Sequence, residues 1–274
     1  RVRYGRSARK LQMTKTIDLW LLDSSSVELS DVEKSYAGLL SAAETKRLSS
    51  YSLARSRKQL LLSRALLRHV LAFYVAIEDY ELTPGSHGRT QIVAKSVGEN
   101  RQEESLAPPE ISFNISHSCE RFVVAVSHAG VVGVDVEYSA RQRRVERLMT
   151  RYFSQAEQAA LMALPATQRQ ERFYALWTLK ESYIKAKGLG LALPLADFSF
   201  SLAPQAKQIC ISFDGSLAGE SPEPWRFWRS SAAGESYALA LAWESQGADE
   251  VEVRSRHAED ARELNHWSDF TRLS

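Results

Sequence analysis

The sequence predicts an α+β fold, because helical and extended patterns are both present and do not alternate strictly along the chain. Three short extended segments follow one another between residues 111 and 137. Apolar residues at helical spacing predict helices over Arg55–Val75 and Glu171–Lys187. A chain of 274 residues is long enough for one large domain or two small ones, each with a real core.

The N-terminal elements can be justified in order. The first strand is expected at the apolar segment Ile17–Leu22. A helix is expected to begin at Ser41, because Glu44 three residues later completes a capping-box pattern. The long helix Arg55–Val75 follows. Residues 83–110 are rich in glycine, proline and polar side chains, and this predicts a loop.

The later elements follow from the same kinds of pattern. The expected strands are Ile111–Ile115, Phe122–Ser127 and Val131–Glu137, with the last two joined as a hairpin by the turn at 127–130. A second capping-box pattern, Ser154 with Glu157, opens a helix that continues to about Leu164. Further elements are expected at Glu171–Lys187, which Gly188 ends, and at Trp225–Trp228 and Tyr237–Trp243. The remainder from residue 246 is a polar tail.

Composition and charge exclude several classes of protein. The net charge is +2, with 35 basic and 33 acidic residues, so no general argument for nucleic acid binding follows. Two isolated cysteines, Cys119 and Cys210, make neither a disulfide framework nor a paired zinc site, and they favour a cytoplasmic setting. No segment has the pattern of a membrane span or a signal peptide. We interpret Met13 as the natural start, and residues 1–12 as a non-native or disordered extension.

Two carboxylates stand at alternate positions of the strand Val131–Glu137. Asp135 and Glu137 share one face of this strand, while the valines at the other positions make the opposite face aliphatic. Paired acids repel each other unless a cation or a basic group lies between them. The alternative is a plain solvated face, although Gly133 in the same strand is typical of close approach by a ligand.

A second pair of charged residues lies on the helix Glu171–Lys187. Glu181 and Lys185 are four residues apart and therefore share a face with Trp177, which lies one turn earlier. The alternative is an ordinary surface ion pair, worth about 0.3–0.5 kcal/mol. Three carboxylates and a lysine, if brought together, form a site for a hard divalent cation and a phosphate-bearing substrate.

Other polar and basic residues extend this picture. Ser116 and His117 lie at a strand end, where a hydroxyl and an imidazole suit phosphate binding, although a structural histidine is the alternative. The helix Arg55–Val75 carries several arginines, which a solvated helix face also explains. A dense group of arginines after Glu137 predicts an acidic partner surface. Its members are Arg141, Arg143, Arg144, Arg147 and Arg151.

The motifs around these residues resemble a known family. The order Phe113–Ser118, then Gly133–Glu137, then Trp177–Lys185 (Trp-Thr-Leu-Lys-Glu-Ser-Tyr-Ile-Lys) resembles the 4′-phosphopantetheinyl transferases of the Sfp type, which activate surfactin synthetase. Asp135 and Trp177 are 177 − 135 = 42 residues apart, within the family's usual gap of about forty. Each motif alone is weak evidence, whereas three in this order and spacing are strong.

The resemblance implies roles for individual residues. Asp135, Glu137 and Glu181 match the family's acidic metal site for Mg²⁺, with Mn²⁺ as an alternative. Lys185 matches a lysine that contacts the phosphates of coenzyme A near the reacting bond. The resemblance therefore implies that Lys185 and Glu181 are the catalytic residues. The remaining matches are to residues that bind the nucleotide end of coenzyme A. They are Ser116, His117, Arg57 and Arg64. Arg89 is also expected to bind coenzyme A, because it follows Gly88 where the family commonly has Gly-Lys-Pro, although Thr90 stands here in place of the proline.

The resemblance also implies a fold and a reaction. The fold would be two similar α+β halves on a pseudo-twofold axis, 13–121 and 122–245, followed by the tail 246–274, with coenzyme A in the cleft between the halves. The reaction would transfer 4′-phosphopantetheine to a serine of an apo acyl or peptidyl carrier protein. The carrier would dock near Arg141, Arg143, Arg144 and Arg147, and the enzyme would act as a cytoplasmic monomer. Glu181 is a candidate general base, acting through the metal or a water.

Two rival functions remain at this point. A non-catalytic module that binds coenzyme A or a nucleotide would use His117 and the arginines but would not need three carboxylates. A metal-dependent phosphodiesterase would use the same carboxylates to activate water, but such sites usually hold two metals and further histidine or aspartate ligands. Only six histidines occur in the chain, none of them suitably paired.

Overall fold

The computed structural model describes most of the chain. The described residues are 15–77, 80–85, 89–94, 111–140, 145–202, 208–245, 250–258, 264, 267–269 and 271–273. The extension expected at 1–12 therefore lies outside them, as do three of the arginines expected at the docking surface, Arg141, Arg143 and Arg144. Within the described parts, no helix is long and apolar enough to cross a membrane.

The two halves of the chain repeat the same order of elements. The N-terminal half runs β1 (Thr16–Asp23), α1 (Leu29–Tyr36), η1 (Ala37–Leu39), α2 (Ala42–Ser49), α3 (Ala54–Leu71), β2 (Tyr80–Pro84), β3 (Thr90–Ala94), β4 (Ser112–Ser118) and β5 (Arg121–Ser127). The C-terminal half runs β6 (Val131–Tyr138), α4 (Val145–Tyr152), α5 (Gln155–Met162), α6 (Ala166–Lys187), β7 (Phe198–Ser201), β8 (Cys210–Phe213), β9 (Trp225–Ser230) and β10 (Tyr237–Glu244), with the short 3₁₀ helices η4 (Gly190–Ala192), η5 (Leu195–Asp197) and η6 (Gly215–Leu217). Within the described residues, each half is thus a strand, three α-helices and four strands.

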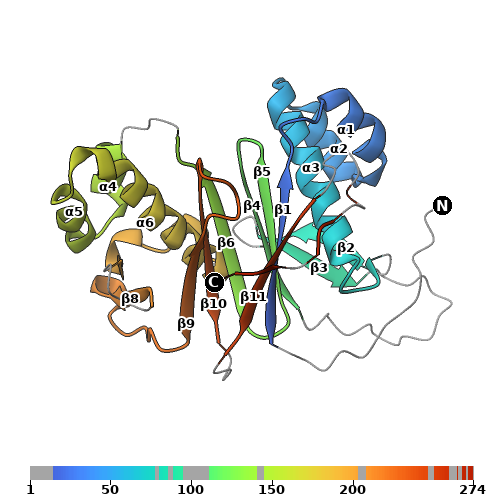
Figure 1. The fold of residues 1–274 in the computed structure, drawn as a ribbon. Coiled ribbons are helices and arrows are strands. Elements are labelled where there is room, and N and C mark those ends of the chain that lie inside the picture. The colour runs from blue at the N-terminus through green and yellow to red at the C-terminus, as the bar shows by residue number, and fades with distance from the viewer. Residues whose placement is uncertain are drawn as a thin grey trace.

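Sheet topology repeats as well. The order β1-β5-β4 in one sheet matches β6-β10-β9 in the other, and each half has a separate two-stranded ribbon, β2-β3 or β7-β8. Figure 1 shows α1–α3 and α4–α6 on opposite sides of the molecule with the two large sheets between them. The predicted α+β class and the two similar halves are therefore confirmed.

Both capping boxes predicted from the sequence are present, and they show the repeat at the level of side chains. Ser41 Oγ accepts from Glu44 N at 3.2 Å, and Ser154 Oγ accepts from Glu157 N at the same distance. Each glutamate then forms an ion pair with the long helix of its own half. Glu44 pairs with Arg64 and Glu157 with Lys180.

Three packed layers of apolar side chains hold the molecule together. One lies between the first sheet and α1–α3, and another lies between the second sheet and α4–α6. The third lies between the two sheets, where Leu19 and Leu21 of β1 meet Val134 and Val136 of β6. Trp20 on the other face of β1 belongs to the first layer. Because side chains alternate along a strand, the side chains on the two faces of β1 belong to two different layers.

The expected hairpin between β5 and β6 is wrong. β5 pairs with β1 and β4, whereas β6 pairs with β10, so the turn carries the chain from one sheet to the other. Gly130 in this turn has φ 85°, and a Cβ there would lie 2.0 Å from Glu244 O at the end of β10. This close packing against β10 fixes the path of the chain from the first sheet to the second. It also gives β5 to the first sheet, although the expected boundary at 121/122 assigned that segment to the second half.

Two further segments differ from the sequence prediction. Residues 83–110 are not all loop, because β2 and β3 form a hairpin closed by Gly85 N donating to Arg89 O. The expected tail contributes β11 (Glu252–His257) and β12 (Thr271–Arg272) to the first sheet, where β11 lies parallel to β1. Only Val253 and Ser255 of β11 are buried, so its apolar pattern was too weak to predict a strand.

The two large sheets are joined along β4 and β6 by side chains. Four side chains of β4 accept hydrogen bonds from alternate backbone N–H groups of β6, at 3.0–3.3 Å. The pairs are Ser112 with Val132, Asn114 with Val134, Ser116 with Val136, and Ser118 with Tyr138. We call this row the serine–asparagine ladder. It fixes β4 against the strand that carries Asp135 and Glu137.

Gly133→Ala is expected to destabilise the fold, because α6 crosses β6 at this residue. A Cβ on Gly133 would lie 2.1 Å from Ser182 O and 2.5 Å from Ala186 N, both of them backbone atoms of α6. We expect a loss of about 1–3 kcal/mol in urea unfolding, the usual range for overpacking. Gly38→Ala is the matched control, since nothing lies within 4 Å of a Cβ there. Equal stability of the two variants would contradict this account, in which Gly133 is needed for the close approach of α6 and not for the approach of a ligand.

Candidate active site

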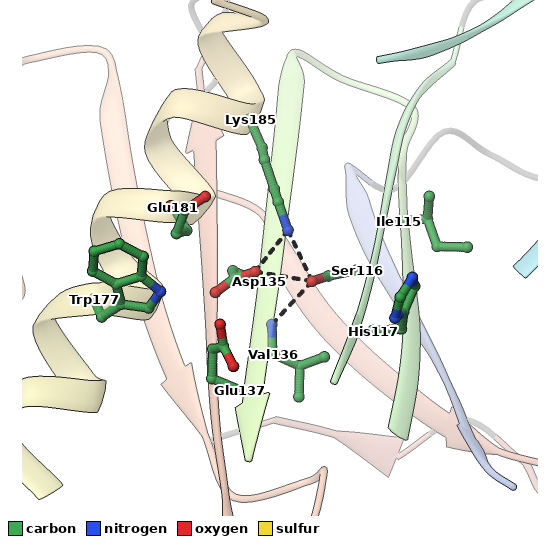
Figure 2. A pocket seen from close by; sticks show the side chains of 9 residues that line it. All are labelled: Ile115, Ser116, His117, Asp135, Val136, Glu137, Trp177, Glu181 and Lys185. Atoms are coloured by element: carbon green, nitrogen blue, oxygen red, sulfur yellow. Dashed lines mark hydrogen bonds and ion pairs between the residues drawn. The ribbon is translucent and has the colours of Figure 1, made fainter. Parts of the chain in front are cut away.

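An open cavity of about 340 Å³ lies where β4, β6 and α6 meet (Figure 2). The residues that line it are Ile115, Ser116, His117, Asp135, Val136, Glu137, Trp177, Glu181 and Lys185. The structure therefore brings together the expected metal ligands, the expected catalytic residues and two of the expected coenzyme-binding residues. The row Trp177, Glu181, Lys185 on α6 faces the two carboxylates of β6, as helical and strand periodicity require.

Lys185 is the cation at the centre of the cavity. Its Nζ lies 2.6 Å from Asp135 Oδ1 and 2.8 Å from Ser116 Oγ, and it also donates to Val134 O at 3.3 Å. Ser116 Oγ in turn donates to Asp135 Oδ1 at 2.9 Å. Asp135 is buried, whereas Lys185 is partly exposed. The ammonium is thus held in place while it remains accessible from the cavity.

Glu181 is the carboxylate whose protonation is most disturbed. Its pKa is raised to about 7, first by burial and then by the nearby charges of Asp135 and Glu137, whereas Lys185 lowers it. Glu137 is oriented by Ser118 Oγ, which donates to its Oε2 at 3.0 Å. A carboxylate with a pKa near neutrality is suited to accept a proton at physiological pH.

The expected metal ligands can be tested against this geometry. In the described residues, no group of three or more His, Cys, Asp or Glu side chains is arranged to hold a metal ion as it stands, and Lys185 occupies one oxygen of Asp135. The other oxygen, Asp135 Oδ2, is buried without a hydrogen-bond partner. Carboxylate oxygens are the ligands that Mg²⁺ prefers. The donor set and this unpaired oxygen therefore fit a hard divalent cation.

His117 lies at the opposite wall of the cavity. Desolvation lowers its pKa, and the positive charges of Lys185 and Arg55 lower it further, although the residue as a whole is exposed. The ring packs on Phe122 at a centroid distance of 5.3 Å. His117 is thus a neutral hydrogen-bonding group in a positive field. Arg55, the neighbouring cation on α3, belongs to the basic helix expected from the sequence, but it was not expected at the site, because only the folded chain brings it near His117.

The three expected coenzyme-binding arginines do not line the cavity. Arg57 forms an ion pair with Glu33 of α1, and Arg64 forms one with Glu44 of α2 at 2.9 Å. Arg89 donates to Ala186 O at the end of α6 at 3.0 Å and to Ser112 Oγ of β4 at 3.4 Å. Both Arg64 and Arg89 have lowered pKa values because of burial. Each arginine has a structural partner that the sequence alone did not reveal.

Lys180, next to Glu181 in the sequence, belongs to the core. Its side chain is fully buried, and Nζ bonds Glu157 Oε2 at 2.8 Å, Leu195 O at 2.7 Å and Phe198 O at 2.6 Å. All three donors of the ammonium are therefore satisfied. Lys180 thus connects α6 with α5, with η5 and with the start of β7, next to Glu181 at the cavity.

Two arginines of the expected partner surface can be placed. Arg147 is exposed on α4, and Arg151 near the end of the same helix stacks over the Tyr152 ring at 5.1 Å. Tyr152 then contacts Trp177 edge to face, with ring centroids 5.6 Å apart. The basic helix α4 therefore contacts the cavity residue Trp177 through the ring of Tyr152.

Fold and site together define the class of protein. Two α+β halves of the same topology meet at a cavity that holds three carboxylates and one lysine, and such groups serve a site for a phosphate-bearing substrate. Residues 131–242, from β6 to β10, match the family model of the 4′-phosphopantetheinyl transferase superfamily. A 4′-phosphopantetheinyl transferase of Bacillus subtilis is 32% identical over 180 residues, which are 65% of this chain and 72% of the relative.

This chain belongs to the 4′-phosphopantetheinyl transferase superfamily. A second relative, 4′-phosphopantetheinyl transferase HetI of Nostoc sp., is 29% identical over 70% of this chain and 76% of its own length. Among solved structures, holo-[acyl-carrier-protein] synthase of Thermotoga maritima is 20% identical with a TM-score of 0.33, and the match covers 50% of this chain and 74% of that one. At this level of likeness it places no residue of the present site.

Proposed function

We propose that this protein transfers the 4′-phosphopantetheine group of coenzyme A to a serine of an apo acyl or peptidyl carrier protein and releases adenosine 3′,5′-bisphosphate. The observation that carries the proposal is the cavity in which Asp135, Glu181 and Lys185 meet within the segment that matches the family model. In the reaction, the serine oxygen bonds to the β-phosphorus, and the bond from that phosphorus to the bridging oxygen breaks.

The residues of the chain have separate tasks in this reaction. Lys185 donates hydrogen bonds to the pyrophosphate, whose negative charge increases on the leaving side as the bond breaks. Glu181 accepts, through a water, the proton that the serine hydroxyl loses. Ser116 orients both Asp135 and Lys185. His117 hydrogen-bonds the 3′-phosphate end of coenzyme A.

Asp135, Glu137 and Glu181 would hold Mg²⁺, or Mn²⁺ in its place. Such an ion supplies positive charge that offsets the charge of the pyrophosphate. Much of the catalysis is then positioning, because phosphoryl-type transfer needs two aligned partners and charge neutralisation and little covalent chemistry from the protein.

The carrier protein would dock on the basic stretch that follows β6. Arg147 and Arg151 on α4 supply exposed positive charge, and an acidic partner would complement it. The two halves in one chain supply the whole cavity, which supports action as a monomer. The free cysteines Cys119 and Cys210 fit a cytoplasmic setting.

Intact mass spectrometry of a carrier protein tests the proposal. The protein is incubated with Mg²⁺, coenzyme A and an apo acyl or peptidyl carrier, and the carrier is expected to gain one phosphopantetheinyl group. A chelator is expected to prevent the gain, and Mn²⁺ added afterwards to restore it. Coenzyme A binding without any gain would favour a binding module. Cleavage of coenzyme A without a carrier would favour a phosphodiesterase.

A further inference from the structure

Two buried polar atoms at the cavity have no hydrogen-bond partner, and they are of opposite kinds. Trp177 Nε1 is a donor and Asp135 Oδ2 is an acceptor. The two residues are only 9% and 5% exposed. Buried polar groups in folded proteins are almost always hydrogen-bonded, so an unpaired donor and an unpaired acceptor beside one cavity point to a ligand that pairs with both.

The indole of Trp177 is held in its orientation by packing. Its ring stacks on Phe173 at a centroid distance of 6.0 Å and 17°, and Tyr152 of α4 meets it edge to face at 69°. Figure 2 shows the nitrogen edge of the ring on the side of Asp135 and Glu137. The N–H is thus directed into the cavity by residues outside it.

Two of the nearby carboxylate oxygens already have partners. Asp135 Oδ1 receives Lys185 and Ser116, and Glu137 Oε2 receives Ser118. A neutral ligand would leave the negative charges of the carboxylates uncompensated. A phosphate bound together with a cation would satisfy both atoms, because the phosphate oxygen accepts from the Trp177 N–H and the cation pairs with Asp135 Oδ2. The chemistry of the cavity therefore favours an anionic oxygen as the partner of Trp177.

We propose that the Trp177 indole N–H donates a hydrogen bond to a phosphate oxygen of coenzyme A bound in this cavity, an inference that rests on the proposed function. Trp177 is then a substrate-binding residue and not only a core residue of α6. Because Tyr152 packs on the same ring, the hydrogen bond also connects the basic helix α4 with the reacting end of the substrate.

Trp177→Phe removes the N–H and keeps an aromatic ring against Phe173. We expect kcat/KM for coenzyme A to fall about 10- to 100-fold, as for the loss of one hydrogen bond to a charged group. The matched control is Tyr183→Phe on the same helix. The Tyr183 hydroxyl is also buried without a hydrogen-bond partner, but its ring packs among Phe198, Phe213 and Trp225, away from the cavity. This control is expected to keep wild-type kinetics.

A spectroscopic measurement separates binding from packing. In protein labelled with ¹⁵N at the six tryptophan indoles, the resonance missing from Trp177→Phe identifies Trp177. Adding coenzyme A and Mg²⁺ without a carrier is expected to move that indole proton downfield, as a new hydrogen bond forms. The same addition to Tyr183→Phe is expected to give the same shift.

The outcomes are distinguishable. If wild-type protein binds coenzyme A and modifies a carrier while the Trp177 resonance stays in place and Trp177→Phe turns over normally, the inference is overturned and a water or nothing pairs with the N–H. If kcat/KM falls only in proportion to a loss of folded protein, Trp177 is a packing residue and the inference is likewise overturned. If wild-type protein neither binds coenzyme A nor modifies a carrier, the proposed function itself fails.

Discussion

Glu181→Gln is expected to lower the rate of phosphopantetheinyl transfer by about 10²–10⁴-fold, the usual contribution of a positioned proton acceptor. The amide keeps the size of the side chain but cannot accept the serine's proton. It also removes one negative charge from the cavity. The measurement is the initial rate of carrier modification at saturating coenzyme A, followed by intact mass. Glu171→Gln, at an exposed carboxylate of the same helix, is the control and should keep the wild-type rate.

The same variant is expected to be more stable than wild type at high pH. Burial raises the pKa of Glu181 to about 7 from 4.5, so the folded state holds a proton that the unfolded state has lost. Stability therefore falls as pH rises from about 4.5 to 7, and the loss, up to about 3 kcal/mol, is complete above pH 7. Glutamine has no ionisable group, so its stability does not fall with pH in this way.

Urea unfolding with a chelator present at pH 5 and pH 8 measures the effect. The free energies of unfolding of Glu181→Gln and wild type should be close at pH 5, and the variant should be the more stable at pH 8. A variant that is inactive and also less stable at pH 8 would show that Glu181 supports the fold, contrary to its proposed place in the reaction.

Lys180→Met is expected to be the most destabilising substitution on α6, with a loss of about 3–5 kcal/mol. Methionine removes the ammonium and leaves Glu157 as a buried carboxylate without its ion-pair partner, together with the carbonyls of Leu195 and Phe198. Burial lowers the pKa of Lys180, whereas Glu157 raises it, so the fold holds this charge only through its partners.

Lys187→Met is the matched control for Lys180→Met. Lys187 also forms a 3.0 Å ion pair, with Glu220, on the same helix, but both side chains are partly exposed. Surface pairs contribute about 0–1 kcal/mol, so this variant should unfold close to wild type in urea. Similar losses in both variants would mean that burial does not distinguish the two lysines.

Local periodicity explains why the carboxylates and the lysine of the cavity could be predicted from the sequence. Asp135 and Glu137 share a strand face because side chains alternate, and Glu181 and Lys185 share a helix face because they are one turn apart. The two capping boxes are also local, since each is complete within four residues. None of these patterns required knowledge of a distant contact.

Distant contacts explain what the sequence could not predict. Arg57 and Arg64 looked free to bind a nucleotide because their partners, Glu33 and Glu44, precede them on other helices. Lys180 and Lys185 have the same chemistry in one motif, yet only the packing of α5 and β7 around α6 makes the first a core residue. Likewise β11 becomes a strand through pairing with β1, which lies at the other end of the chain.

The serine–asparagine ladder has a consequence for solubility. β6 is an edge strand of its own sheet, and an edge with open N–H groups can recruit strands from other molecules and begin aggregation. Here short side chains of β4 occupy the N–H groups of Val132, Val134, Val136 and Tyr138. The strand that carries Asp135 and Glu137 is thereby closed to intermolecular pairing, while both carboxylates still line the cavity.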